Sequence, residues 1–70
     1  MITLDKIRVR LQESIKQSGY SQTELAKLLG VSQPSIAYYL SGGKMPALDT
    51  LANLCKIIDV SPAYILCFEN

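Results

Sequence analysis

Two helix signals that lie almost back to back constrain the fold of this chain more than any other feature. The letters SQTE begin at Ser21, whose hydroxyl can cap free backbone amides while the Glu24 carboxylate reaches back to it. Gly30 ends this helix, because glycine adopts a left-handed conformation at little steric cost. Ser32 begins the next helix only two residues later. The sequence therefore predicts two short helices that meet at a sharp angle.

Apolar side chains recur on one face of each of these two helices. The inward positions are Leu25, Leu28 and Leu29 in the helix that starts at Ser21, and Ile36, Tyr39 and Leu40 in the helix that starts at Ser32. Ala26 is small at the position where the two helices would cross. The opposite face of the later helix is polar and aromatic, with Gln33, Pro34, Ala37, Tyr38 and Ser41. Together these constraints specify a helix-turn-helix.

Three further helices are predicted around that pair. The earliest runs from Leu4 to about Ser18, with the apolar stripe Leu4, Ile7, Leu11 and Ile15, and Gly19 ends it. Another follows Pro46, with the apolar stripe Leu48, Leu51, Leu54, Cys55 and Ile58. Ser61 and Pro62 start a short last helix. The predicted fold class is therefore all-α, with five helices in one compact domain over residues 1–70.

Composition narrows the class of protein. No apolar run is long enough to span a membrane, and charged residues stand where an export signal would need apolar ones, so we expect a cytoplasmic location. Cys55 and Cys67 have no histidine to complete a metal site, so neither a metal nor a cofactor is expected, and Cys55 is expected as a reduced core residue. No nucleophile has an evident base beside it and no phosphate-cradling glycine motif occurs, which argues against an enzyme.

The segment QTELAKLLGVSQPSIAYYLSGG, from Gln22 to Gly43, and the downstream LDTLANLCKIIDVSPAYIL resemble the Cro and lambda-repressor-like (XRE-type) helix-turn-helix family. The likeness covers nearly the whole chain. It implies the compact five-helix lambda-repressor-like DNA-binding domain, with the helix-turn-helix in helices 2 and 3. It also implies a sequence-specific regulator of transcription, a repressor rather than an activator, that binds double-stranded DNA and reads the major groove with the helix starting near Ser32.

The resemblance assigns roles to individual residues. Base reading falls to the exposed face of the helix from Ser32, which comprises Ser32, Gln33, Pro34, Ala37 and Tyr38. Gln33 is the first choice, because its amide can donate and accept at the N6 and N7 edge of adenine. Contacts to the DNA backbone are expected from Gln22, Ser35, Ser41, Gly43 and Lys44. The alternative is that Gln22 and Gln33 are ordinary solvated residues and that Tyr38 serves a dimer interface.

Four positions depart from the family pattern. Relatives often pair an arginine late in the first helix with a glutamate late in the third, and the matching residues here are Ile15 and Leu40, which predicts a hydrophobic contact. Asp59 stands where glycine is usual after the fourth helix, which makes that turn less favourable. Pro34 replaces a polar side chain often used for base contact, so part of the family's recognition pattern does not transfer.

A homodimer on a palindromic operator is expected, because one recognition helix reads only a few base pairs. Tyr64, Ile65, Leu66 and Phe68 form the candidate dimer interface, although the same residues could instead complete the core of the monomer. No membrane partner is expected. The modest net charge of +1 and Pro34 support an alternative function, a helix-turn-helix protein-interaction module that does not bind DNA. A related alternative is an antitoxin whose hydrophobic C-terminal tail binds another protein.

Overall fold

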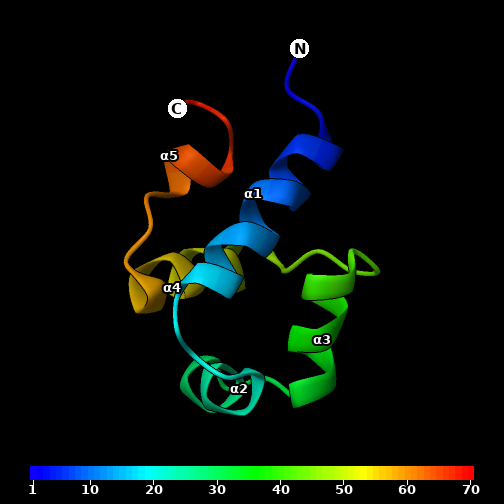
Figure 1. Ribbon diagram of the computed structural model, residues 1–70, viewed down its shortest axis with the longest axis vertical. Coiled ribbons are helices and arrows are strands. Elements are labelled where there is room, and N and C mark those ends of the chain that lie inside the picture. Colours follow the sequence, from blue (N-terminus) through cyan, green and yellow to red (C-terminus); the bar gives the residue numbers. More distant parts are fainter.

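Five α-helices and no strand make up the computed structural model, which describes residues 1–70 (Figure 1). They are α1 (Leu4–Gln17), α2 (Gln22–Leu29), α3 (Gln33–Ser41), α4 (Leu48–Ile58) and α5 (Pro62–Ile65). The all-α class, the order of the helices and their predicted starts and ends are confirmed. None of the five has both the length and the apolar character needed to cross a bilayer.

Side-chain caps explain where α2 and α3 begin. The Ser21 hydroxyl accepts the Glu24 amide at 3.1 Å, and the Glu24 carboxylate accepts the Ser21 amide at 3.0 Å, which completes the predicted capping box. The Ser32 hydroxyl accepts the Ser35 amide at 3.3 Å. Since each bond satisfies an amide that has no partner inside the helix, these serines define the first residues of the two helices.

Left-handed residues end three of the helices. Gly30 and Gly42 follow α2 and α3 with φ angles of +72° and +81°. Asp59 follows α4 with φ +57° and ψ +50°, so this position has the conformation for which the family uses glycine. Aspartate visits this region more readily than most side chains, which allows α4 to end here without glycine.

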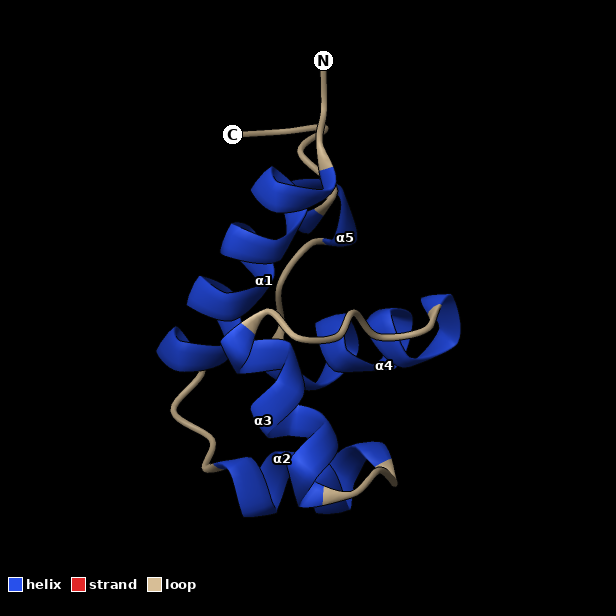
Figure 2. Ribbon diagram, turned by 90° about the vertical axis from the view of Figure 1, so that its right-hand side faces the viewer, coloured by secondary structure: helices blue, strands red, loops and turns tan.

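The helices enclose one core to which all five contribute. Its buried apolar residues are Leu11, Ile15, Leu25, Ala26, Ile36, Tyr39, Leu51, Leu54, Cys55, Ile58 and Ile65. Helix α1 packs against α3 and α5, and α2 packs against α3 and α4. In Figure 2, α4 runs across the direction of α1, and both chain ends lie at the opposite end of the molecule from α2. Cys55 is free and buried, as predicted, and burial raises the pKa of its thiol.

Three leucines that were expected on the inner faces of their helices are instead exposed. Leu4, Leu28 and Leu48 keep 56%, 55% and 83% of their surface. Leu4 and Leu48 are the first residues of α1 and α4, where the neighbouring helices no longer cover them. Helix α2 is covered only on the side of α3 and α4, where Leu25 and Ala26 are buried, and Leu28 lies outside that contact. Their predicted inward placement is therefore wrong.

Candidate nucleic-acid interface

The outer face of α3 carries the residues that were predicted to read bases. Ser32, Gln33, Pro34 and Tyr38 are exposed, and Ala37 is half-buried. On the opposite side of the same helix, Ile36 has no exposed surface. The predicted division of α3 into an inner and an outer face is therefore confirmed, and the outer face is a free surface with no formal charge.

The turn between α2 and α3 is closed by backbone hydrogen bonds. The Gly30 amide donates to the Ala26 and Lys27 carbonyls, and the Val31 amide donates to Ala26 at 3.0 Å. Val31 packs against the core, and Ala26 is buried where the helices cross. Because these contacts leave little freedom between the helices, the start of α2 and the outer face of α3 keep a constant relative position.

The start of α2 offers hydrogen-bond donors to solvent. Gln22 is exposed, and the amides of Gln22 and Thr23 have no acceptor within the protein. Hydrogen bonds from the backbone and side chain of Ser21 hold the pKa of the Glu24 carboxyl below its usual range. Unpaired amides at a helix start carry partial positive charge and suit a phosphate oxygen, and the docking role of Gln22 stays a prediction.

The hydroxyls of Ser32 and Ser35 are hydrogen-bonded to each other. Their Oγ atoms lie 2.9 Å apart, and the Ser32 hydroxyl also accepts the Ser35 amide. Ser35 is half-buried. Their main contribution in this structure is therefore to begin α3, and a contact with DNA by either hydroxyl would compete with this pairing.

The loop after α3 contains three residues predicted to contact the DNA backbone. The Ser41 hydroxyl donates to the Tyr38 carbonyl at 3.1 Å, so its proton is already used. The Gly43 amide is bonded to the same carbonyl at 3.0 Å. Lys44 is exposed and belongs to no ion pair, since the single ion pair joins Arg8 and Asp5. Of the three, Lys44 is the one whose donor is free for a phosphate.

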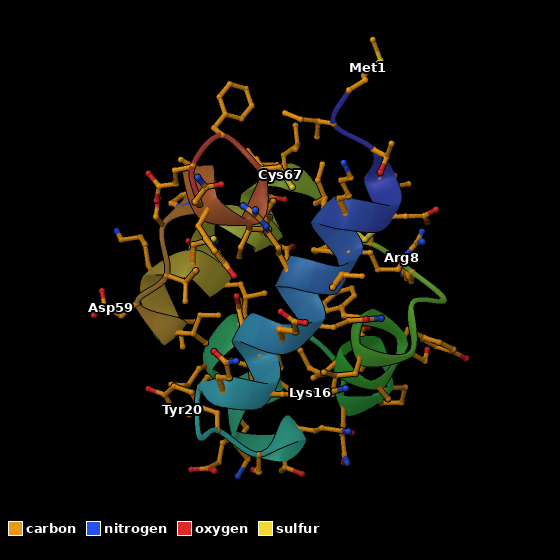
Figure 3. All side chains as sticks on the ribbon, turned by 45° about the horizontal axis from the view of Figure 1, so that its top comes forward. Met1, Arg8, Lys16, Tyr20, Asp59 and Cys67 are labelled. Carbon is orange, nitrogen blue, oxygen red and sulfur yellow. The ribbon has the colours of Figure 1, made fainter.

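Two side chains of α1 reach the end of α3, and the sequence did not single them out. A Cβ added to Gly42 would lie 2.9 Å from Arg8 Cδ and 3.3 Å from Gln12 Nε2. Figure 3 shows Arg8 on the side of α1 that faces the chain after α3. The Arg8 guanidinium donates to the Asp5 carboxylate at 2.6 Å. No local pattern predicts this contact, because it joins segments that are distant in sequence.

The C-terminal segment lies against α1 and only partly fits the predicted dimer interface. The Arg10 guanidinium donates to the Tyr64 and Glu69 carbonyls at 2.7 and 2.6 Å and lies 4.6 Å from the centre of the Tyr64 ring. Ile65 has no exposed surface, so it belongs to the core and cannot contact a second copy. Tyr64 and Leu66 are half-buried against the core, whereas Phe68 keeps 79% of its surface.

Comparisons with known proteins agree with this architecture. Residues 11–65 match the model of the helix-turn-helix family. The chain is 36% identical over 60 residues to the uncharacterized HTH-type transcriptional regulator YqaE of Bacillus subtilis, which covers 86% of this chain and 52% of that protein. It is 33% identical over 57 residues to the HTH-type transcriptional regulator ImmR of the same organism, which covers 81% and 45% of the two chains.

A third relative comes from an archaeon. The chain is 44% identical over 50 residues to a putative HTH-type transcriptional regulatory protein of Pyrococcus furiosus, which covers 71% of this chain and 16% of that protein. The chain thus spans about half the length of the Bacillus relatives and a smaller part of the archaeal one. No solved structure matches. The family match extends over most of the chain and includes α2 and α3, so this protein belongs to the XRE-type helix-turn-helix family.

Proposed function

We propose that this chain is a sequence-specific regulator of transcription that lays α3 in the major groove of double-stranded DNA. One observation carries the proposal: the outer face of α3 is free, while its inner face is held rigidly in the core by Ile36 and Tyr39. A helix fixed on one side and open on the other fits the major groove, which admits a single α-helix. The transcriptional regulators among the relatives support the same function.

Reading of bases is assigned to the uncharged side chains of α3. Gln33 lies in the first turn and is exposed, so its amide can pair with the N6 and N7 edge of adenine. Tyr38 keeps 56% of its surface, and its ring can pack on a thymine methyl while its hydroxyl bonds a phosphate. Ser32, Pro34 and Ala37 complete the surface and contribute shape rather than charge.

Docking on the DNA backbone is assigned to the two ends of the helix-turn-helix. Gln22 and the free amides at the start of α2 would bind one phosphate, and Lys44 after α3 would bind another. Gly43 allows the loop to approach closely, and Ser35 and Ser41 shape the turns on either side of α3. Because few cations take part, binding should depend on salt, but with a shallow slope.

A homodimer on a palindromic operator fits this arrangement. An open groove of about 770 Å³ lies between α1 and the C-terminal segment, lined by Met1, Ile2, Asp5, Lys6, Val9, Arg10, Glu13, Tyr64 and Cys67. Phe68 is largely exposed and follows this lining in the chain. These surfaces are the proposed pairing site for two copies, since half-sites of a palindromic operator lie about 34 Å apart and each needs its own α3. The mass of the protein in solution tests the pairing.

The regulator would act in the cytoplasm, without a cofactor and without catalysis. A dimer bound over a promoter excludes polymerase, so repression is the proposed outcome. The low net charge and the exposed Phe68 support a second candidate, an interaction module or antitoxin that binds another protein through its C-terminal tail. DNA binding that weakens with salt supports the regulator, and its absence for every duplex supports the interaction module.

The test is a selection of bound duplexes from a random pool, repeated with three variants. Gln33→Ala should relax the preference at one base position in each half-site, because it removes a base contact worth about 1–3 kcal/mol. Gln22→Ala should weaken all sequences about equally, because it removes a phosphate contact. Gln17→Ala is the matched control, an exposed glutamine at the end of α1. Identical selected sequences for Gln33→Ala and wild type would remove Gln33 from the reading surface.

A further inference from the structure

We infer that Arg8 and Gln12 of α1 position the end of the recognition helix α3 for DNA binding, although neither residue belongs to the helix-turn-helix. The inference rests on the proposed DNA-binding function. It assigns to α1 a role in the interface without a contact to DNA. The observations that carry it are the close approach at Gly42, the unusual state of the Arg8 side chain, and the charge balance of α3.

The close approach at Gly42 joins α1 to the end of α3. Arg8 Cδ and Gln12 Nε2 fill the place where any other residue would carry its Cβ, at 2.9 and 3.3 Å from that position. The amides of Gly42 and Gly43 both donate to the Tyr38 carbonyl. The two α1 side chains therefore press on a turn whose hydrogen bonds lead directly back to Tyr38, a residue of the reading surface.

The state of the Arg8 side chain is not explained by packing alone. Its Nε is buried without a hydrogen-bond partner, and the side chain is 27% exposed. A buried donor without a partner is unfavourable, and an apolar side chain of similar length would fill the same space without that penalty. The opposite end of the guanidinium is held by Asp5 at 2.6 Å. The charged group is thus held beside the end of α3, with little freedom to reach a phosphate.

The dipole of α3 gives a physical reason for a basic side chain beside Gly42, where the helix ends. Lys16, Lys27 and Lys56 lie in the last turns of α1, α2 and α4, where a positive charge compensates the negative end of the helix dipole. Helix α3 has no basic residue in its last turn. Arg8 lies against the residue that ends α3 and is the basic side chain at this helix end, where the Asp5 carboxylate 2.6 Å away offsets part of its charge.

Holding this turn in one conformation fixes the position of the base-reading side chain relative to the phosphate-binding side chain. Tyr38 lies before Gly42, and Lys44 follows it by two residues. A turn that is held in one conformation keeps the base-reading side chain and the phosphate-binding cation in one relative position. Loosening the turn would let Lys44 still bind a phosphate while the reading surface loses its alignment. Arg8 and Gln12 are thus positioning residues, and their loss should reduce specific binding more than non-specific binding.

The test compares Arg8→Met with Lys56→Met. Both variants remove one positive charge near the end of a helix, but Lys56 is exposed in the last turn of α4 and belongs neither to the helix-turn-helix nor to the groove beside the C-terminal segment. Affinity is measured for the selected operator and for an unrelated duplex over a range of salt, at a temperature well below melting. Arg8→Met should weaken operator binding about fivefold more than Lys56→Met does. The unrelated duplex and the salt slope should be the same for both variants, and Arg8→Lys should recover most of the loss.

Amide hydrogen exchange provides a second measurement that needs no DNA. The Gly43 amide should exchange faster in Arg8→Met than in wild type or Lys56→Met, because its bond to the Tyr38 carbonyl opens more often. Gln12→Ala removes the other contact and should show the same pattern, so the test does not depend on Arg8→Met being stably folded.

Three results would overturn the inference, and each has a different meaning. Equal behaviour of Arg8→Met and Lys56→Met would show that the end of α3 needs no support from α1. A salt slope lower by about one, with equal losses on both duplexes, would make Arg8 a direct phosphate contact. Failure of the wild-type protein to bind any duplex would instead remove the proposed function, and the inference with it.

Discussion

Replacing Gly42 by alanine tests two constraints that meet at the end of α3, the backbone conformation and the contact with α1. The φ angle of +81° places Gly42 in the left-handed region, which costs a residue with a side chain about 1–2 kcal/mol. The new Cβ would also lie 2.9 Å from Arg8 Cδ, so the Arg8 stem would have to move. Gly30 is the matched control, because its φ angle is +72° and nothing lies within 4 Å of an added Cβ.

The difference between the two glycines sets the expected loss of unfolding free energy. Gly30→Ala should lower the free energy of unfolding by about 1–2 kcal/mol, which is the backbone term alone. Gly42→Ala carries the same term and adds the displacement of Arg8, for which overpacking suggests at least about 1 kcal/mol more. One kcal/mol shifts the melting temperature of a domain of this size by about 4–8 °C. Gly42→Ala should therefore melt at least about 4 °C below Gly30→Ala.

Thermal melts followed by circular dichroism measure this difference, and a double-mutant cycle assigns its cause. In an Arg8→Ala background the shortened side chain leaves room for the new Cβ, so Gly42→Ala should destabilise less than it does alone, by at least about 0.5 kcal/mol. Equal melting temperatures for Gly30→Ala and Gly42→Ala, without coupling to Arg8, would refute the packing of α1 against Gly42.

Two further perturbations address other parts of the chain. Leu40→Glu should lower the melting temperature, because Leu40 packs against the core that contains Ile15 and a carboxylate there would lose its contact with water. Adding Ile15→Arg should recover part of the loss by pairing the two charges. An unchanged melting temperature for Leu40→Glu would remove the proposed contact between Leu40 and Ile15. Glu24 has a pKa below its ordinary value in the folded protein, so its stabilising effect is present above the ordinary carboxyl pKa and is lost as the pH falls through the lowered one. Urea titrations of Glu24→Gln at several acidic pH values should show a shallower loss of stability than wild type, and parallel curves would contradict this cap contribution.

The parts of the fold that could be predicted depend on interactions between residues close in sequence. The capping box at Ser21 and Glu24 needs only a spacing of three residues. Gly30 ends a helix through its own backbone freedom, whatever surrounds it. The separation of Ile36 from Gln33 on opposite faces of α3 follows from the helical repeat. Helix bounds and the orientation of the recognition surface are properties of this local kind.

The parts that could not be predicted depend on which neighbour covers a given position. Leu28 and Leu29 have the same character in the sequence, yet Leu29 packs against the core and Leu28 keeps 55% of its surface. Ile65 and Phe68 were grouped on one apolar tail, yet the core takes the first and leaves the second exposed. Helical spacing identifies the apolar face of a helix. How much of that face is buried depends on where the neighbouring helices pack, and the local sequence does not specify this.

The contact between Arg8 and Gly42 shows the same limit for the candidate site, and it also clarifies the low net charge. Helix α3, for which base reading by Gln33 and Tyr38 is proposed, carries no charged side chain, so it contributes no attraction for phosphates. The unpaired cation beside this helix is Lys44, which follows it in the chain, whereas Arg8 at the end of the helix is paired with Asp5. Because counterion release depends on contacts with phosphates, salt should weaken docking while leaving the hydrogen bonds to bases largely unaffected. A net charge of +1 is therefore compatible with the proposed sequence-specific binding, which assigns selectivity and phosphate attraction to different residues of the same small domain.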